Sequence, residues 1–506
     1  MLFNSYIFIF LFLPVVLAGF YLIGARGHHR VAISWLVGAS LFFYGWWNPV
    51  YLGLILGSIL FNYATGVALG SNHSGKRKGI LTFGVAVNLG LLGYFKYANF
   101  FVDNINGLFG SAFHLETIIL PLAISFYTFQ QIAYLVDAYR GETREYSFLH
   151  YCLFVTFFPQ LIAGPIVHHK EMLPQFARDI VYRLNLEHLA IGLTIFIIGL
   201  FKKVVLADSM AVYATPVFDA AEQGISLTLL EAWGGALAYT LQLYFDFSGY
   251  SDMAIGLARM FGILLPLNFS SPYKAVNIID FWRRWHITLS RFLRDYLYIP
   301  FGGNRKGKAR RYVNLMATML LGGLWHGAGW TFVLWGALHG FYLTVNHAWH
   351  ALRRSAGRDL QNPSWPGLAA ARTFTFVAVV VSWVIFRAES LGGAANVLIA
   401  MSGARGISSP AGAGGGDLFV NQLANWSSGI PLITLFLLVA WFMPNTQQIM
   451  IAHKPALEAD SIETGPAYTR WLRWKPGIAW SFVIAFAALV SIYRLSSPSE
   501  FLYFQF

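Results

Sequence analysis

The stretch Leu320-Leu-Gly-Gly-Leu-Trp-His-Gly-Ala-Gly-Trp330 indicates how this chain is built. It begins as the end of a long apolar run, and its glycines then interrupt any helix that reaches them. His326 lies at this interruption, between Trp325 and Gly327. Ionisable side chains at membrane depth are costly and rare, so they mark functional sites by default. We therefore expect a broken or re-entrant helix with His326 beside a cavity.

The composition of the chain is that of a membrane protein. Of its 506 residues 57% are hydrophobic and 11% are charged, whereas a soluble domain carries about 25% charged residues. The apolar runs are continuous and long, which predicts helices rather than a barrel. We predict an all-α integral membrane protein with about 11–13 apolar segments, some re-entrant or broken, around a central tunnel. It forms one domain over residues 1–506, with core motifs in 90–350 and a C-terminal transmembrane extension in 370–506.

Charged loops predict the orientation of the chain. Basic residues follow the first, third and fifth apolar segments, namely Arg26, Arg30, Lys76, Arg77, Lys78, Arg140 and Arg144. These loops are therefore placed in the cytoplasm, and the loop Ala98–Thr117, which has acidic but no basic residues, is placed outside. Simple alternation would then put the basic run Phe281–Arg311 outside. We expect breaks at Phe158–Pro165 and Leu320–Trp330 to correct this count.

His326 has the surroundings of a catalytic base. Trp325 and Trp330 flank it, and the neighbouring glycines allow a helix or a ligand to approach the backbone closely. A neutral imidazole can act as a general base at physiological pH, which typically supplies about 10²–10⁴ in rate. The alternative is a histidine that only packs between helices.

A second histidine, His286, lies in Phe281-Trp-Arg-Arg-Trp-His-Ile-Thr-Leu-Ser290. If Asp280–Tyr298 is one helix, the apolar side chains form a stripe and His286 lies at its margin. A catalytic role and an interfacial role both remain open. For His339 and His347 a packing or interface role is favoured.

The segment around His286 is strongly basic. Between Phe281 and Arg311 there are nine basic residues and one acidic residue, Asp295. The run either forms a cytoplasmic loop against anionic lipid or binds a phosphate-rich partner. The candidate donor-binding residues are Arg283, Arg284, Arg291 and Arg294. We expect no nucleic-acid partner.

A polar cluster follows the apolar run that begins at Leu227. Asp246, Tyr250 and Asp252 are the candidates for polar support of a tunnel, together with Trp325. Asp246 either orients an imidazole or forms a structural ion pair with an arginine. The chain has a single cysteine, Cys152, and no His-Glu-x-x-His motif, so we expect no metal site and no bound cofactor.

These motifs together resemble the membrane-bound O-acyltransferase family, in its bacterial alginate O-acetyltransferase-like branch. The matching stretches are Gly93–Asn99, Pro121–Tyr127, Ile162–Pro165, Leu243–Gly256, Phe281–Pro300, Leu320–Trp330 and the closing Phe501–Phe506. The resemblance implies a multi-helix fold around a tunnel, with the invariant histidine of the family at His326 and its second histidine at His286. It further implies acyl transfer from a cytoplasmic thioester, acetyl-CoA or an acyl carrier, to a hydroxyl outside, with periplasmic partner proteins.

The sequence thus predicts a polysaccharide O-acetyltransferase, multi-pass in the bacterial inner membrane, with an exported polysaccharide, alginate-like in the first instance, as acceptor. The stretches Phe129–Tyr134 and Phe158–Leu161 depart from the pattern of dedicated alginate producers, which leaves other exopolysaccharides or cellulose open. Two alternatives remain. One is D-alanyl transfer to teichoic acid, and the other is a transporter of an anion or a lipid-linked saccharide that uses the histidines and aspartates as a proton relay.

Overall fold

The computed structural model describes residues 1–71, 75–142, 147–357, 364–407, 417–458, 462–465, 467–496 and 502. Within these residues the secondary structure is helical, with no strand, which confirms the all-α class. Four helices in this part of the chain are long and apolar enough to cross a membrane. Arg144, and the closing motif Phe501–Phe506 apart from Leu502, lie outside the described residues.

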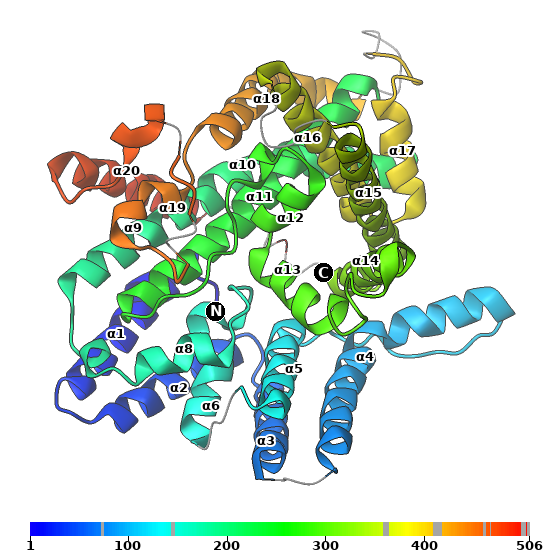
Figure 1. Cartoon of the computed structure of the whole chain (residues 1–506). Helices are drawn as coiled ribbons and strands as arrows, with labels where there is room; N and C mark the ends of the chain where they lie inside the picture. The colour runs from blue at the N-terminus through cyan, green and yellow to red at the C-terminus, as the bar shows by residue number, and fades with distance from the viewer. Residues whose placement is uncertain are drawn as a thin grey trace.

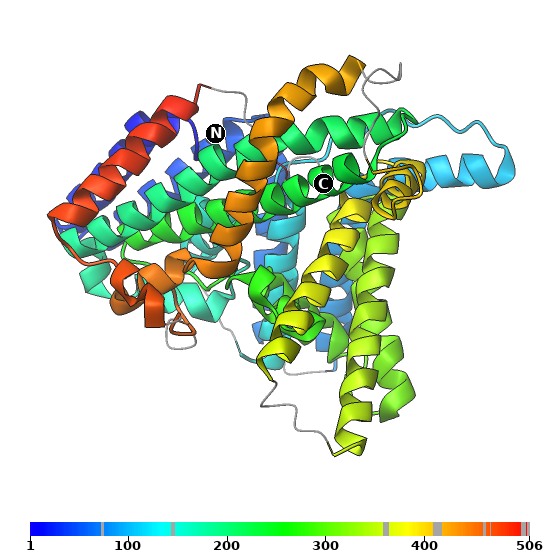
Figure 2. The same ribbon diagram turned by 90° about the horizontal axis from the view of Figure 1, so that it is seen from above.

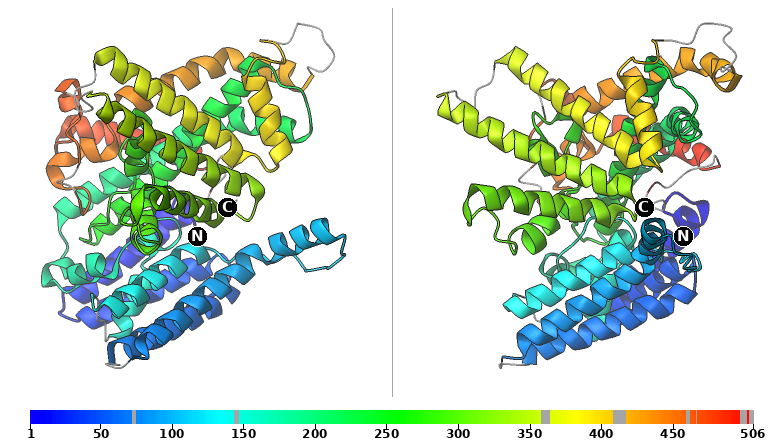
Figure 3. Two further views of the ribbon diagram at one scale, coloured as in Figure 1. Left: turned by 45° about the vertical axis from the view of Figure 1, so that its right-hand side comes forward. Right: turned by 90° about the vertical axis from the view of Figure 1, so that its right-hand side faces the viewer.

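The N-terminal helices form one side of the molecule (Figure 1). They are α1 (Leu13–Gly24), α2 (His29–Gly45), α3 (Val50–Ser71), α4 (Arg77–Phe109) and α5 (Ile124–Arg140). Helices α3, α4 and α5 contact one another, and the far end of α4 projects beyond the bundle in Figure 1 and in the left view of Figure 3.

Two closely packed helices form the centre, α9 (Leu186–Phe201) and α11 (Leu229–Met260). They approach at two glycine pairs, and a Cβ added to Gly192 or Gly199 would lie 2.6 Å from the carbonyl oxygen of Gly256 or Gly249, respectively. Small residues allow such backbone contact between membrane helices. The two glycines on each helix are seven residues apart, so both pairs lie along one seam.

The C-terminal helices form the opposite side (Figure 3). They are α14 (Gly307–His326), α15 (Trp330–Ser355), α16 (Trp365–Arg387), α17 (Leu391–Met401) and α18 (Asp417–Phe442). Helix α18 crosses over the central helices, and α20 (Ile478–Arg494) packs against α9 at the far edge (Figure 2). The shorter helices are α6 (Phe148–Thr156), α7 (Phe158–Leu161), α8 (His169–Phe176), α10 (Asp208–Glu222), α12 (Ile278–Arg284), α13 (Ile287–Leu293) and α19 (Thr446–Ile449).

The two breaks that the sequence predicts are present. Helix α14 ends at His326 and α15 begins at Trp330, on the other side of three residues that include two glycines. The chain between Phe157 and Val167 is buried, although only the four residues of α7 are helical in its first half.

Residues Asp280–Tyr298 do not form one helix, so the condition under which His286 would lie at the margin of an apolar stripe is not met. The chain forms α12 and α13 with His286 between them in a left-handed backbone conformation, φ +43°, and a π-helical turn, Arg294–Tyr298, follows. The segment around this break contains no glycine or proline that would indicate it in the sequence. Tertiary contacts of His286, described below, hold it in place.

The basic run lies at the end of the molecule that the charged loops place in the cytoplasm. The Tyr296 hydroxyl donates to Oδ1 of Asp137 near the end of α5 at 2.8 Å, and the Arg140 guanidinium lies over the Tyr296 ring at 5.6 Å. The run and the loop after α5 therefore share one side, and the conflict in the alternation of spans disappears.

Candidate functional site

His326 is the last residue of α14 and is enclosed by aromatic rings. Its ring centroid lies 4.9 Å from that of Trp325, 5.1 Å from Trp335 and 5.2 Å from Phe386, each ring at a steep angle to the imidazole. The residue is 8% exposed. Helix α14 ends here and α15 begins at Trp330, and this tight turn requires glycine at position 327, where a Cβ would lie 2.1 Å from the ring of Phe332. The imidazole is thus fixed in a dry, apolar setting.

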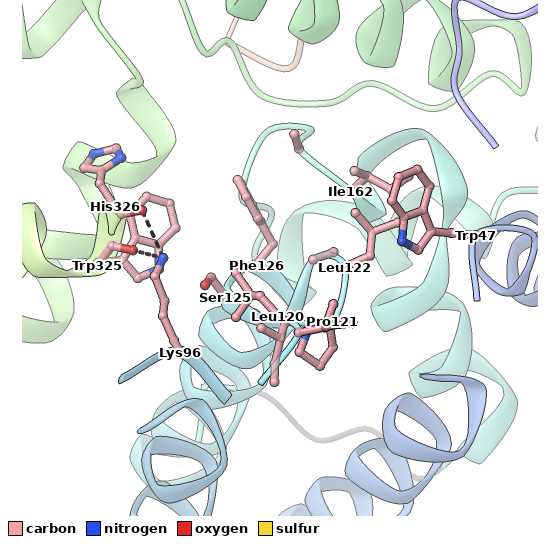
Figure 4. Close-up of a pocket in the computed structure, with 14 residues that line it drawn as sticks. Trp47, Lys96, Leu120, Pro121, Leu122, Ser125, Phe126, Ile162, Trp325 and His326 are labelled. Carbon is pink, nitrogen blue, oxygen red and sulfur yellow. Dashed lines mark hydrogen bonds between the residues drawn. The ribbon is translucent and has the colours of Figure 1, made fainter. Parts of the chain in front are cut away.

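One face of His326 opens into a cavity of 230 Å³, which we call the His326 cavity. Its wall consists of Trp47, Lys96, residues 119–126, Ile162, Ala163, Trp325 and His326. Trp325 and His326 lie across the cavity from Trp47 and Leu122 (Figure 4). Trp47 follows α2, and residues 119–126 follow the acidic loop after α4, so the cavity lies toward the side that the sequence places outside.

Two side chains of α4 donate hydrogen bonds to the C-terminal end of α14. The Lys96 ammonium donates to the carbonyl oxygens of Trp325 and His326 (Figure 4), and the Tyr97 hydroxyl donates to the carbonyl oxygen of Leu324 at 2.8 Å. The last carbonyls of a helix have no partner within it and need one at membrane depth. Lys96 and Tyr97 therefore fix the turn that carries His326. Sequence reasoning gave them no role, although a lone lysine in an apolar run was a signal.

His286 lies one side chain away from the cavity. It is fully buried, and its ring packs edge-on against Phe247 at 4.8 Å and lies 6.2 Å from the ring of Trp325. It is close enough to His326 for electrostatic interaction. The two histidines that the sequence singles out, forty residues apart, thus both lie beside the Trp325 ring, at 6.2 Å for His286 and 4.9 Å for His326.

His339, a third buried histidine near this site, has hydrogen-bond partners for both of its ring nitrogens. His339 Nδ1 accepts a hydrogen bond from the indole N–H of Trp282 at 3.2 Å, and its Nε2 lies 3.0 Å from the hydroxyl of Ser382. Both ring nitrogens have partners, which agrees with the predicted packing role.

Three of the four candidate donor-binding arginines are paired with carboxylates. Arg284 binds Asp280 at 2.8 Å and Glu463 at 2.7 Å. Arg291 binds Glu171 at 2.9 Å and Glu458 at 3.0 Å. Arg294 binds its neighbour Asp295 at 2.7 Å, and this hydrogen bond raises the pKa of the Arg294 guanidinium. Their charge is largely neutralised within the protein.

Arg283 is different because it borders a second pocket, of 720 Å³, which we call the basic pocket. Lys308, Arg311 and Arg354 also line it, and no ion pair joins any of these four side chains to a carboxylate within the described residues. Asp280 is the one acidic residue in its wall and is paired with Arg284. The pocket lies at the start of α14, opposite the end that carries His326.

The aspartates of the polar cluster form buried ion pairs in the interior of α11, not at its end as predicted. Asp246 pairs with Lys203 at 2.5 Å, and Asp252 pairs with Lys202 at 2.6 Å. Asp252 also accepts hydrogen bonds from Thr446 and Gln447. Neither aspartate pairs with an arginine, and the sequence analysis assigned no role to Lys202 or Lys203.

Of the two aromatic residues predicted to support the tunnel, Trp325 lines the His326 cavity and Tyr250 does not. Tyr250 is buried and stacks on Phe3 at 4.8 Å. Trp325 is part of the wall itself. Among the described residues no group of three His, Cys, Asp or Glu side chains is arranged to hold a metal ion.

The all-α fold with apolar helices and the buried His326 beside a cavity agree with one class of membrane protein. The membrane-bound O-acyltransferase family model matches residues 137–386, which include His286 and His326. The chain belongs to this family, and it is an O-acyltransferase.

Particular relatives refine this class. The chain is 48% identical over 436 residues to a peptidoglycan O-acetyltransferase from Helicobacter pylori, which covers 81% of each protein. It is 41% identical over 519 residues to "Probable alginate O-acetylase AlgI" from Pseudomonas putida, which covers both proteins completely. A teichoic acid D-alanyltransferase from Streptococcus thermophilus is 28% identical over 52% of this chain.

Proposed function

We propose that this enzyme transfers an acetyl group from a cytoplasmic thioester to hydroxyl groups of an exported polysaccharide. One observation carries the proposal, namely that the two ends of α14 border different pockets. The basic pocket lies at its start and the His326 cavity at its end. A helix of 20 residues is about 30 Å long, close to the thickness of the hydrocarbon core. Donor and acceptor can therefore approach from opposite faces of the membrane.

The chemistry requires a base at the point where donor and acceptor meet. His326, as the neutral imidazole, takes the proton of the attacking hydroxyl, whose oxygen forms a bond to the acetyl carbon. The carbon–sulfur bond then breaks, and the proton passes to the departing thiolate. The aromatic rings around His326 exclude water, which protects the thioester from hydrolysis and strengthens electrostatic interactions.

The basic pocket supplies a site for the donor's phosphates. Acetyl-CoA and the phosphopantetheine arm of a carrier protein both combine phosphate with a thioester, and neither crosses lipid because of its charge. Arg283, Lys308, Arg311 and Arg354 offer guanidinium and ammonium groups that no described carboxylate neutralises. Arginine is suited to bidentate phosphate binding.

The four candidate arginines allow a matched test of the donor site. Arg283→Ala should raise the KM for acetyl-CoA about tenfold or more, with a KM that depends less steeply on salt than that of the wild type. Arg294→Ala, which removes a guanidinium already paired with Asp295, should leave the KM nearly unchanged. Equal KM values for Arg283→Ala and the wild type would contradict the assignment of this pocket.

The acceptor is proposed from the relatives. Their names specify alginate and peptidoglycan, two polymers outside the inner membrane, so we place the enzyme in that membrane. Peptidoglycan is an acceptor that the sequence motifs did not suggest. The acetyl group reaches the polymer either directly, when one of its hydroxyl groups enters the His326 cavity, or through a periplasmic acetyltransferase partner that accepts the group there.

The acceptor can be tested in cells that lack the gene. O-acetyl esters should disappear from the exported polysaccharide or the peptidoglycan, and return when the wild-type gene is restored. Unchanged esters on both polymers would contradict the proposal. The D-alanyl alternative is less supported because the relatives with that name match half of the chain. Family membership likewise favours an enzyme over a transporter.

A further inference from the structure

His286 is held by contacts that determine which of its ring nitrogens carries the proton. Its Nδ1 lies 3.1 Å from Oδ1 of Asn268. Asn268 is fully buried, in the segment between α11 and α12, and its backbone carbonyl accepts a hydrogen bond from the N–H of Ile287. The imidazole and the amide are therefore fixed by the same junction of segments.

The oxygen of the Asn268 amide, rather than its nitrogen, faces His286. The same atom accepts hydrogen bonds from the backbone N–H of Thr288 at 3.4 Å and from its hydroxyl at 3.0 Å. A backbone N–H can only donate, so an amide nitrogen in this position would be repelled. The Thr288 hydroxyl also accepts a hydrogen bond from the N–H of Ile166. Its own proton is therefore the one that it donates to Oδ1 of Asn268. An acceptor facing Nδ1 requires that Nδ1 carry the proton.

The other nitrogen, Nε2, is then a base without a partner. It is buried and has no hydrogen-bond partner among the residues that the structure describes, in contrast to both ring nitrogens of His339. Leaving a buried polar atom unpaired costs about 1–3 kcal/mol. The ring also sits on a left-handed backbone, φ +43°, a strain that concentrates at functional sites.

We propose that Asn268 is a positioning residue that holds His286 as the Nδ1–H tautomer, so that Nε2 accepts a hydrogen bond from an O–H or N–H group of a substrate in the site around Trp325. The inference rests on the proposed acetyl transfer. In this form Nε2 cannot donate to the thioester carbonyl. His286 therefore orients an acceptor hydroxyl or an amide N–H of the donor, and His326 remains the base.

Three variants separate positioning from a purely structural role. Asn268→Leu keeps a similar shape and removes the acceptor, whereas Asn268→Asp keeps an oxygen facing Nδ1. Thr288→Val removes the other hydroxyl bond at the same junction and leaves His286 with its partner. For each variant in lipid nanodiscs, the melting temperature and the kcat and KM of acetyl transfer are measured.

We expect Asn268→Leu to lower kcat/KM about 10- to 100-fold, as for other groups that orient a functional histidine. Asn268→Asp and Thr288→Val should stay within a few-fold of the wild type. A raised KM for acetyl-CoA would assign the substrate group to the donor amide, and a lowered kcat or a raised KM for the acceptor would assign it to the hydroxyl. Equal loss in Asn268→Leu and Thr288→Val, or full activity of Asn268→Leu, would overturn the proposal.

A measurement on the unmodified protein covers the case in which variants fail to fold. In ¹⁵N spectra of histidine-labelled protein, the His286 signals, assigned by their loss in His286→Asn, should show a protonated Nδ1 and an unprotonated Nε2. A protonated Nε2 would overturn the inference and leave the proposed function intact. Absence of acetyl transfer by the wild type would instead refute the proposed function and leave the tautomer assignment standing.

Discussion

Lys96 gives the most informative perturbation of the site. Its ammonium donates to two carbonyl oxygens at the end of α14, and hydrogen bonds to charged groups contribute about 1.5–3 kcal/mol each. The two bonds together therefore stabilise this turn by roughly 3–6 kcal/mol. Against this, a lysine at membrane depth costs about 2.5–3.5 kcal/mol. The two terms largely offset one another in the stability of the whole protein.

Lys96→Met should consequently change the melting temperature little and the activity strongly. The net loss of unfolding free energy is about 0–3 kcal/mol by this estimate, but the turn that carries His326 loses both hydrogen bonds from Lys96. We expect kcat to fall about 10- to 100-fold, as when an orienting group is removed from a functional histidine. The assay is transfer of labelled acetyl from acetyl-CoA by protein in nanodiscs, with thermal unfolding followed in parallel.

Tyr97→Phe is the matched control for Lys96→Met. It removes one neutral hydrogen bond, to the carbonyl of Leu324, one residue earlier in the same turn, which contributes about 0.6 kcal/mol between membrane helices on average. Its kcat should stay within a few-fold of the wild type. Wild-type kcat in Lys96→Met, with the protein folded and inserted, would refute the reasoning that α4 holds His326 in place.

Three further perturbations test the packing, the buried charges and the basic pocket. Gly323→Ala should lower the melting temperature, because its Cβ would lie 2.3 Å from a backbone carbonyl oxygen of α15 and overpacking costs about 1–3 kcal/mol. Gly322→Ala, whose Cβ would lie 3.2 Å from a side-chain atom, is the control. Equal melting temperatures of the two variants would speak against the close approach of α14 and α15. Lys202→Met leaves the Asp252 carboxylate without its ion-pair partner and should lower the free energy of chemical unfolding by about 3–5 kcal/mol. Adding Asp252→Asn should recover part of this free energy. No recovery in the double variant would argue against the ion pair. Burial and the charges of neighbouring arginines lower the pKa of both His347 and His350 in the basic pocket. Acidification should therefore protonate these histidines and lower the KM for acetyl-CoA, and the same pH dependence in a variant with both changed to glutamine would contradict this.

The break at His326 was predictable because its signal is local. Gly327 and Gly329, directly after His326, disfavour continuation of the helix. Gly322 and Gly323, before it, remain helical, and Gly323 meets Gly336 where α14 and α15 pack together. The all-α membrane class followed in the same way from long apolar runs. Features that depend on the residues of one segment can be derived from that segment.

The break at His286 was not predictable because its cause is distant. Its segment reads as an amphipathic helix, and the left-handed residue is held by Asn268, eighteen residues earlier. Arg284 and Arg291 likewise pair with Glu463 and Glu458, carboxylates that folding brings from far along the chain. The sequence therefore located the basic run but did not distinguish its neutralised arginines from Arg283.

The ion pairs of α11 are an intermediate case. Buried carboxylates need cations nearby, so Asp246 and Asp252 called for two basic partners in an apolar setting. Lys202 and Lys203 satisfy this requirement, and their position directly after a long apolar run was a usable signal. Which lysine meets which aspartate depends on the register of α9 against α11, set by glycine contacts that the sequence pattern does not reveal.

The central claim is that His326 is the base of acetyl transfer, and the most direct measurement compares two buried histidines. Labelled acetyl transfer from acetyl-CoA is measured for His326→Ala and for His339→Ala, whose histidine packs with both nitrogens satisfied. The account predicts that His326→Ala lowers kcat by about 10²–10⁴ while the protein stays folded, and that His339→Ala lowers the melting temperature with kcat per folded molecule within a few-fold. Folded His326→Ala protein that transfers acetyl at the wild-type rate would contradict it.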